Sequence, residues 1–372
     1  MARLIKVGSG GDEIEWKDAL NNIQPDDVLL LEPGYYRIEP GFNVNDLTIK
    51  GTGSSPEDTV IEGYFVLGSE CSFFTLENLA INTKSKNNSI FVEQTANTYL
   101  TLRNTVIHGG NDDTAGIAVN GKCTLELFST KIVGASLSLF KDADFRVTMN
   151  DSLIDYPSNK FAAIGIQGKG TSIISGSTIN GSISTYPNSN SELDIDNCRV
   201  NKILVHGSTW MNMINSSILD RGDTALYLSD DSWANIIRSN FVGGVFADKK
   251  IKAIMQNCKM DRLIVCDQVQ ITLSNCTIIS HADFQDESEA DATRTAFSGN
   301  NKFQYFLALN KSATLKGKDL ILNPNGSALA VKDEAKVKIK VISSSQQSLE
   351  VEGLTAPNVD IIGLKWKMKR DE

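Results

Sequence analysis

One short sequence phrase recurs along most of this 372-residue chain, and it limits the possible folds more than any other feature. In each copy apolar residues alternate with polar ones, and an anchor residue follows, usually Asn, before a small residue and a further apolar one. Residues 100–107 (LTLRNTVI) and 271–278 (ITLSNCTI) are two clear copies. Such alternation is typical of β-strands, whose successive side chains point to opposite faces. The anchors of ten copies are Asn78, Asn104, Ser129, Asp151, Gly176, Asn197, Asn215, Arg238, Asn257 and Asn275.

The spacing of these anchors predicts a coil. Nine steps cover 275 − 78 = 197 residues, so one repeat has about 22 residues. A second short strand, such as 117–119 or 164–166, precedes the anchor by about ten residues, and the remainder leaves no room for a helix. Each repeat is therefore expected to form one coil whose strands pair with those of the next coil. A leucine-rich repeat has a similar period, but its Asn is followed by a spacer and its strands alternate with helical segments.

This pattern resembles the right-handed parallel β-helix of the pectin-lyase-like superfamily over roughly residues 14–365. The short amphipathic segment 16–23 and the segments 24–36 and 47–51, which are similar to the family's first coil, support the resemblance. It implies an all-β fold, a single-stranded right-handed parallel β-helix (solenoid) with an N-terminal helical cap. The expected divisions are residues 1–27 as the cap with its short helix, 28–365 as the parallel β-helix and 366–372 as a basic tail.

Stacking of coils makes residues about 22 apart in sequence into neighbours about 4.7–4.9 Å apart. The anchors then form a ladder of bends, because Asn and Gly adopt left-handed backbone more easily than other residues, and stacked Asn amides can bond one another. The residue after each anchor is small and is expected to point inward. Cys258 and Cys276 fall in this column on adjacent coils, where we expect buried free thiols.

Composition and charge exclude several classes of protein. Lys and Arg number 36 and Asp and Glu 45, so the net charge of −9 argues against a nucleic-acid partner. No apolar run approaches the roughly 20 residues of a membrane-spanning helix, so no membrane insertion is expected. The first residues lack an apolar segment of signal-peptide length, which favours a cytoplasmic location, with a phage particle or non-classical export as alternatives. No Cys-x-x-Cys pair, helical His pair or phosphate-binding loop is present, so neither metal nor cofactor is expected.

The candidate catalytic carboxylates are Asp112, Asp113, Asp155, Asp220 and Asp223. They lie in loops that join the short strand after one anchor to the strand that begins the next coil. The run 110–113 (GNDD) is similar to the acidic-pair motif of β-helix glycosidases, although the partner motifs of that family are absent. A glycosidase would need two carboxylates about 5–9.5 Å apart. The segment 281–302, with five Asp and Glu side chains before residue 292, is expected to be a long solvated loop.

An aromatic patch is the sharpest surface feature. Trp210 and Trp233 each lie five residues before an anchor, so they are expected in one outward column on consecutive coils. His206 and Tyr227 belong to the same two coils. Exposed aromatic rings beside carboxylates suit a sugar ring or the apolar anchor of a partner protein. The predicted ligand-binding residues are His206, Trp210, Tyr227, Asp230, Asp231 and Trp233.

The outward face of the strands before the turn is neutral to mildly apolar, with no cluster of catalytic type. It favours a non-catalytic scaffold that binds a protein or oligosaccharide partner along its solvent-facing surface. The alternative is a carbohydrate-active enzyme, a polysaccharide lyase or glycoside hydrolase, that uses the loop carboxylates. A phage or surface receptor-binding spike is a further alternative, for which a trimer in solution is expected.

Overall fold

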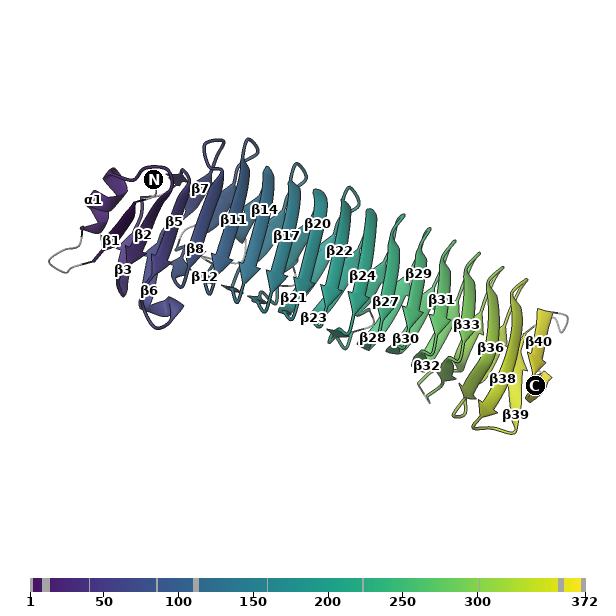
Figure 1. The fold of residues 1–372 in the computed structure, drawn as a ribbon. Helices are drawn as coiled ribbons and strands as arrows, with labels where there is room; N and C mark the ends of the chain where they lie inside the picture. The colour runs from purple at the N-terminus through teal and green to yellow at the C-terminus, as the bar shows by residue number, and fades with distance from the viewer. Residues whose placement is uncertain are drawn as a thin grey trace. The chain divides into compact units, whose positions relative to one another are not determined.

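A computed structural model gives the fold of residues 3–8, 14–39, 41–84, 86–109, 114–158, 160–222, 224–300, 302–353 and 358–368. The chain divides into two compact units, Met1–Asp194 (unit 1) and Ile195–Glu372 (unit 2). Strands of successive coils pair in parallel within each unit (Figure 1). This pairing confirms the predicted all-β parallel solenoid, whose handedness stays a prediction. No helix within these ranges is long and apolar enough to cross a bilayer.

A coil of this solenoid has up to three strands, which we call first, second and third. A turn joins the first to the second strand, and the anchor bend joins the second to the third. The second strands of unit 1 are β1 (Leu4–Val7), β2 (Asp27–Leu31), β5 (Leu47–Gly51), β8 (Phe73–Glu77), β11 (Asn97–Arg103), β14 (Lys122–Phe128), β17 (Asp144–Asn150), β20 (Lys169–Ser175) and β22 (Asn190–Asp196), the last of which passes the unit boundary. The third strands are β3 (Gly34–Arg37), β6 (Thr59–Glu62), β9 (Ala80–Asn82), β12 (Val106–His108), β15 (Lys131–Val133) and β18 (Leu153–Asp155). The first strands are β4 (Phe42–Val44), β7 (Phe65–Leu67), β10 (Ile90–Val92), β13 (Ala115–Val119), β16 (Ser136–Leu139) and β19 (Ile164–Ile166), while β21 (Thr178–Thr185) serves as third and then first strand.

Unit 2 repeats this plan, with several strands that run from the third position into the first. Its second strands are β24 (Ser208–Ile214), β27 (Trp233–Ile237), β29 (Lys252–Gln256), β31 (Gln270–Ser274), β33 (Glu289–Thr293) and β40 (Val359–Ile362). Strands that serve as third and then first are β23 (Arg199–Val205), β28 (Asn240–Ala247), β30 (Lys259–Val265) and β32 (Thr277–Phe284), while β36 (Thr314–Asn323) and β38 (Lys336–Ser344) serve as second and then third. The remaining strands are the third strands β25 (Ser217–Ile218) and β34 (Ala296–Ser298) and the first strands β26 (Leu226–Leu228), β35 (Tyr305–Leu309), β37 (Ala328–Val331), β39 (Ser348–Glu352) and β41 (Lys365–Met368).

Within the described ranges, helix is confined to two short pieces in unit 1. The α-helix α1 (Trp16–Asn21) falls within the predicted segment 16–23, and the 3₁₀ helix η1 (Pro56–Asp58) lies in a loop. The Trp16 ring meets the edge of the Tyr36 ring, with centroids 5.2 Å apart, and its indole N–H donates to the Arg37 carbonyl at 2.7 Å. These contacts attach the helix to the first coils.

The anchor residues form the bends that the sequence predicts. All ten have positive φ angles, between 46° for Asn104 and 59° for Gly176. Asn and Gly tolerate this left-handed backbone, and each bend moves the following strand onto the third wall. Two further bends with φ of 48° and 57° occur at Arg294 and Asp319, which the sequence phrase did not reveal.

Stacked anchor side chains bond one another, as the ladder model requires. The Asn104 amide N–H donates to Asn78 Oδ1 at 2.7 Å in unit 1. In unit 2 the Asn275 amide N–H donates to Asn257 Oδ1 at 2.5 Å. These bends are therefore held by a neighbour on the adjacent coil as well as by their own backbone.

The column of residues that follow the anchors is buried, and its hydroxyl groups also accept hydrogen bonds. Its hydroxyl groups accept the backbone N–H of the previous coil, as in the bond from Thr130 N–H to Ser152 Oγ at 3.0 Å and from Ser216 N–H to Ser239 Oγ at 3.2 Å. A buried N–H without an acceptor would cost about 1–3 kcal/mol. The predicted members are all buried: Thr105, Thr130, Ser152, Ser177, Cys198, Ser216, Ser239, Cys258 and Cys276.

Cys258 and Cys276 are free thiols, and both are buried, as expected from their place in this column. The hydrogen bond with the Cys276 thiol, together with burial, raises the pKa of the Cys258 thiol well above its ordinary value. A protonated, buried thiol is a poor nucleophile. Cys258 therefore serves packing.

The prediction of a long solvated loop at 281–302 is wrong. The segment contains the end of β32, all of β33 and β34, and the bend at Arg294. Ala290, Ala292 and Phe297 fill the inward positions that larger aliphatic residues occupy elsewhere. Alanine is too weak an apolar signal to reveal the alternation beside so many carboxylates, so this coil escaped detection in the sequence. Its Asp and Glu side chains consequently stand in ordered columns.

Candidate binding surfaces

The outward column of the first strands has small side chains from β13 to β21 of unit 1. Ala118 of β13 pairs in register with Ser138 of β16, and Ser138 pairs with Gly165 of β19. Gly165 pairs in turn with Ser184 of β21. Because the backbone spacing of the wall is fixed, small outward side chains leave its surface recessed.

A groove of about 200 Å³ occupies this recess. Its floor includes Ser138 and Gly165, and its flanks include Tyr156, Phe161 and Tyr186. A Cβ atom added at Gly165 would lie 3.7 Å from Cε2 of Tyr186, so the ring stands directly over the floor. The described residues of the lining are Asn88, Thr114, Ala115, Ser136, Ser138, Leu139, Phe140, Tyr156, Phe161, Ala162, Gly165, Gln167 and Tyr186.

The groove is uncharged along the whole of this lining and is rich in hydroxyl and amide groups. Asn88 accepts the Ala115 backbone N–H at 3.0 Å, which leaves its NH₂ group as a donor. The hydroxyls of Ser136 and Ser138 lie 3.1 Å apart and bond each other. Phe161 is 49% exposed, so a large part of its ring is open to a ligand.

The loop that supplies Tyr156 and Phe161 begins at a predicted catalytic residue, Asp155. Its Oδ1 accepts a hydrogen bond from the Asn180 amide at 3.3 Å, on the adjacent coil. Phe161 in turn is held by its backbone N–H, which donates to Ser158 Oγ at 3.4 Å. Asp155 thus helps to fix the loop beside the groove and does not line it.

The other four predicted carboxylates divide into two groups. Asp220 lies in unit 2, where its Oδ1 accepts the Gly222 backbone N–H at 2.8 Å and its Oδ2 lies 3.9 Å from Lys202 Nζ. These contacts are those of a residue that stabilises a turn. Asp112, Asp113 and Asp223 lie outside the described residues.

From β23 to β30 of unit 2 the outward column of the first strands is filled by large side chains. Leu204, Tyr227, Phe246 and Ile264 pair in register along it, and all are half-buried. The rings of Tyr227 and Phe246 stack with centroids 5.4 Å apart and an interplanar angle of 27°. The predicted ligand residue His206 lies beside them, its ring centroid 5.2 Å from that of Tyr227.

Polar contacts hold this aromatic row in place. The Tyr227 hydroxyl donates to Asp248 Oδ2 at 2.7 Å, and burial together with this bond raises the pKa of Tyr227 above its ordinary value. Asp230 accepts the Gly207 backbone N–H at 2.9 Å and the Lys249 ammonium group, and these two bonds lower the pKa of its carboxyl. His206 Nδ1 lies 3.8 Å from Asp230 Oδ2. The neighbouring predicted residue, Asp231, is exposed.

Trp210 and Trp233 pair in register on consecutive second strands, as the sequence predicts. Their ring centroids are 4.0 Å apart with an interplanar angle of 31°, and Trp210 is 50% exposed. Because each ring covers a face of the other, the pair forms an apolar ridge rather than an open platform. Its role in ligand binding stays a prediction.

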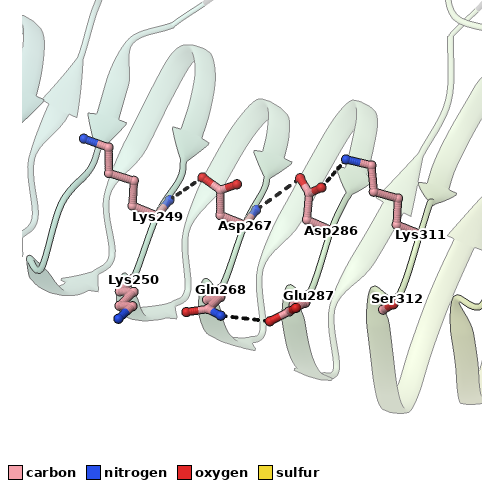
Figure 2. A pocket seen from close by; sticks show the side chains of 8 residues that line it. All are labelled: Lys249, Lys250, Asp267, Gln268, Asp286, Glu287, Lys311 and Ser312. Atoms are coloured by element: carbon pink, nitrogen blue, oxygen red, sulfur yellow. Dashed lines mark hydrogen bonds and ion pairs between the residues drawn. The ribbon is translucent and has the colours of Figure 1, made fainter.

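The turns between first and second strands in unit 2 form a ladder of charged residues, which we call the turn ladder. Figure 2 shows the side chains of Lys249, Asp267, Asp286 and Lys311 side by side along it. Carboxylates accept backbone N–H groups of the previous coil, as Asp267 does from Lys249 at 3.0 Å and Asp286 from Asp267 at 3.3 Å. All members have φ between 56° and 65°: Asp230, Lys249, Asp267, Asp286, Lys311 and Asp333.

The sequence reasoning missed both the groove aromatics and the turn ladder. Ala118 and Gly165 were recognised as part of a neutral outward column. Their small size, which leaves room for the groove, was the property that mattered. The turn ladder follows the outward column of the first strands by three positions, as Asp230 follows Tyr227 and Lys249 follows Phe246, so its Asp and Lys residues could have been aligned once the coils were registered. Among the described residues, no group of three or more His, Cys, Asp or Glu side chains is placed to hold a metal ion.

No protein-family model matches this sequence, and no curated protein matches it. Among solved structures, a PL6 family alginate lyase is 9% identical, with a TM-score of 0.33 over 95% of this chain and 80% of that chain. The A-module of a mannuronan C-5 epimerase from Azotobacter vinelandii is 12% identical, with a TM-score of 0.24 over 92% of this chain and 91% of that chain. Both are parallel β-helix proteins, and at these scores the similarity carries no argument about activity.

Proposed function

We propose that this protein binds carbohydrate without cleaving it, and that the groove of unit 1 holds an uncharged sugar residue of a glycan. The composition of the groove carries this proposal: aromatic rings flank a floor of small residues, and no lining side chain among the described residues is charged. A sugar ring presents apolar C–H faces and several hydroxyl groups. It therefore suits a site that combines aromatic rings with amide and hydroxyl partners.

The size and flanks of the groove fit one ring of a longer chain. Its volume of about 200 Å³ is below the roughly 300–1,000 Å³ of sites for drug-sized ligands. Phe161 offers an exposed ring face at one flank, and Tyr186 stands over the floor. The amides of Asn88 and Gln167 supply donors and acceptors for sugar hydroxyls. Further sugar residues would extend out of the groove along the wall.

The neutral lining also argues for a neutral glycan over a polyuronate. Recognition of a carboxylate polymer needs Lys or Arg side chains at the site. Lys160 belongs to the same loop as Phe161 but does not line the groove. We therefore expect binding that changes little with ionic strength, because it does not depend on charge.

A glycan array followed by calorimetric titration of the best neutral oligosaccharide tests the proposal. Phe161→Ala and Tyr186→Ala should each weaken binding by about tenfold, since an aromatic contact is worth about 0.5–1.5 kcal/mol beyond its buried area. Tyr99→Ala is the matched control, because Tyr99 is 61% exposed on the second-strand wall of the same unit. Equal losses in all three variants, or an array with no neutral ligand, would remove the proposal.

A second candidate function, glycoside hydrolysis, has one observation in its favour. Thr114 lines the groove and directly follows Asp112 and Asp113 in sequence, and Tyr156 directly follows Asp155. The uncharged lining favours a hydrolase over a lyase acting on uronates. Release of new reducing ends by the wild-type protein, lost in a D112N/D113N variant that still binds the glycan, would replace the non-catalytic proposal with this one.

A further inference from the structure

We propose that unit 2 carries a self-complementary charged surface by which two copies of this chain form an antiparallel dimer. The surface combines the turn ladder with the adjacent outward column of the second strands. It lies entirely within unit 2 and is separate from the glycan groove, so the two proposals fail independently.

Three consecutive coils give this surface a basic, a neutral and an acidic stripe. The basic stripe consists of Lys249, Lys250 and Lys252, and the neutral stripe runs through Gln268 and Gln270 on the next coil. The acidic stripe, Asp286, Glu287 and Glu289, follows on the third coil. Figure 2 shows two residues from each of the three coils: Lys249 and Lys250, then Asp267 and Gln268, then Asp286 and Glu287.

The stripes are too far apart to satisfy each other within one chain. Register places Lys252 two coils from Glu289, which is about 9–10 Å. Ion pairs need their charged atoms within about 4 Å. Lys250, Lys252 and Glu289 have no ion pair with any other residue that the structure describes, so their charges remain open to a second molecule.

A two-fold axis along the neutral stripe makes the surface complementary to itself. Rotation by 180° about this axis puts each basic stripe opposite the partner's acidic stripe, which is the arrangement of an isologous dimer. Lys250 then faces the partner's Glu287, and Lys252 faces the partner's Glu289. Lys249 faces the partner's Asp286 in the turn ladder.

Residues on coils farther from the axis also face partner residues with which they can interact favourably. Asp230 lies two coils from Asp267 on one side of the axis and Lys311 two coils on the other, so they face each other across the interface. Trp210 lies three coils from Gln270, opposite the partner's Lys336, where an ammonium group can contact the exposed indole. Two positions do not match: Asp267 faces its own copy at the axis, and Ile254 faces the partner's Asp291.

Analytical ultracentrifugation of the full chain at two salt concentrations gives the first measurement. We expect a dimer in about 50 mM NaCl and mainly monomer in about 500 mM NaCl, because screening shortens the reach of exposed charges. A monomer or a trimer in the low-salt buffer would overturn the proposal.

Charge reversal gives the decisive measurement. The variants K250E/K252E and E287K/E289K each place like charges opposite one another, and each should weaken the dimer by at least about tenfold. An equimolar mixture of the two variants should form a heterodimer, because both of its contacts are then attractive. The chain with all four substitutions should dimerise with itself again.

These outcomes separate a self-interface from a surface for another protein. Loss of dimer in both variants without recovery in the mixture, or a dimer in either variant alone, would show that the stripes do not face each other across a two-fold axis. Circular dichroism melting of each variant is the control for folding, and the unchanged melting expected for exposed side chains keeps the comparison valid. A Tyr99→Ala variant, altered in unit 1, should dimerise like the wild type.

Discussion

The two units share one backbone plan, and they differ in part of the outward column of their first strands. From β13 to β21 of unit 1 the column holds Ala118, Ser138, Gly165 and Ser184, and a groove opens above it. From β23 to β30 of unit 2 the same column holds Leu204, Tyr227, Phe246 and Ile264, and stacked rings occupy the space. Side-chain volume on an otherwise constant wall therefore decides whether the surface is hollow or filled.

This contrast shows where a solenoid can vary. Inward columns must fill a core of constant width, so their residues keep a narrow range of size and polarity. Outward columns have no such constraint, and neighbouring coils add their choices together into a groove, an aromatic row or a charged stripe. Function in this protein is accordingly expected on the outward columns.

The largest effect is expected from a substitution that fills the groove of unit 1 with a large side chain, as in the filled column of unit 2. Ser138→Phe places a ring at the floor of the groove, between Ala118 and Gly165, and should weaken glycan binding by at least about 100-fold, or about 2.7 kcal/mol. Titration calorimetry measures the affinity, and circular dichroism verifies the fold. Unchanged binding by a folded S138F protein would show that the ligand does not enter the groove.

The converse change should affect stability instead of binding. Tyr227→Ala removes a half-buried ring that stacks on Phe246 and bonds Asp248, and should lower the free energy of unfolding by about 1–3 kcal/mol. Tyr99→Ala, at a 61% exposed position, should change it by less than about 0.5 kcal/mol. Urea denaturation measures both. A Y227A protein that loses glycan affinity but no stability would assign the ligand site to unit 2.

The smallest expected effect concerns the turns beside these two columns. Unit 1 has Gly121 and Gly168 two positions after the ends of β13 and β19, whereas unit 2 has Asp230 two positions after the end of β26. The pKa of the Asp230 carboxyl is lowered by the Gly207 N–H and Lys249, so its contribution is present above its unfolded pKa near 4. That contribution is lost as pH falls through the lowered folded pKa.

Asp230→Asn should therefore reduce stability by less than about 1 kcal/mol at pH 7, and the difference between the two proteins should shrink as the pH falls from 7 through the lowered folded pKa of the wild-type carboxyl. Thermal melting of both proteins across this pH range measures the difference. A gap between them that stays constant with pH would mean that the charge of Asp230 does not stabilise the turn.

Features that repeat from coil to coil could be predicted from the sequence, whereas coils and loops that depart from the repeat could not. The ten anchors were found because Asn and its substitutes recur beside strong apolar residues, and all ten have the left-handed backbone expected. The coil with the Arg294 bend was missed, since Arg is an unusual bend residue and alanines hide the strand. Of the predicted site, the register of Trp210 with Trp233 followed from counting residues. The groove did not, because Tyr156 and Phe161 reach it from a loop of irregular length.

The sequence by itself determined the parallel solenoid, the position of nearly every bend and the identity of the inward columns. These are local properties: alternation sets a strand, and a left-handed residue followed by a small one sets a bend. Only the tertiary structure decided which outward side chains meet. Coils here differ in length by several residues, and the pairing of strands absorbs each difference in a loop or turn. The stripes from Lys252 to Glu289 and the rings around Gly165 exist only after that pairing is made.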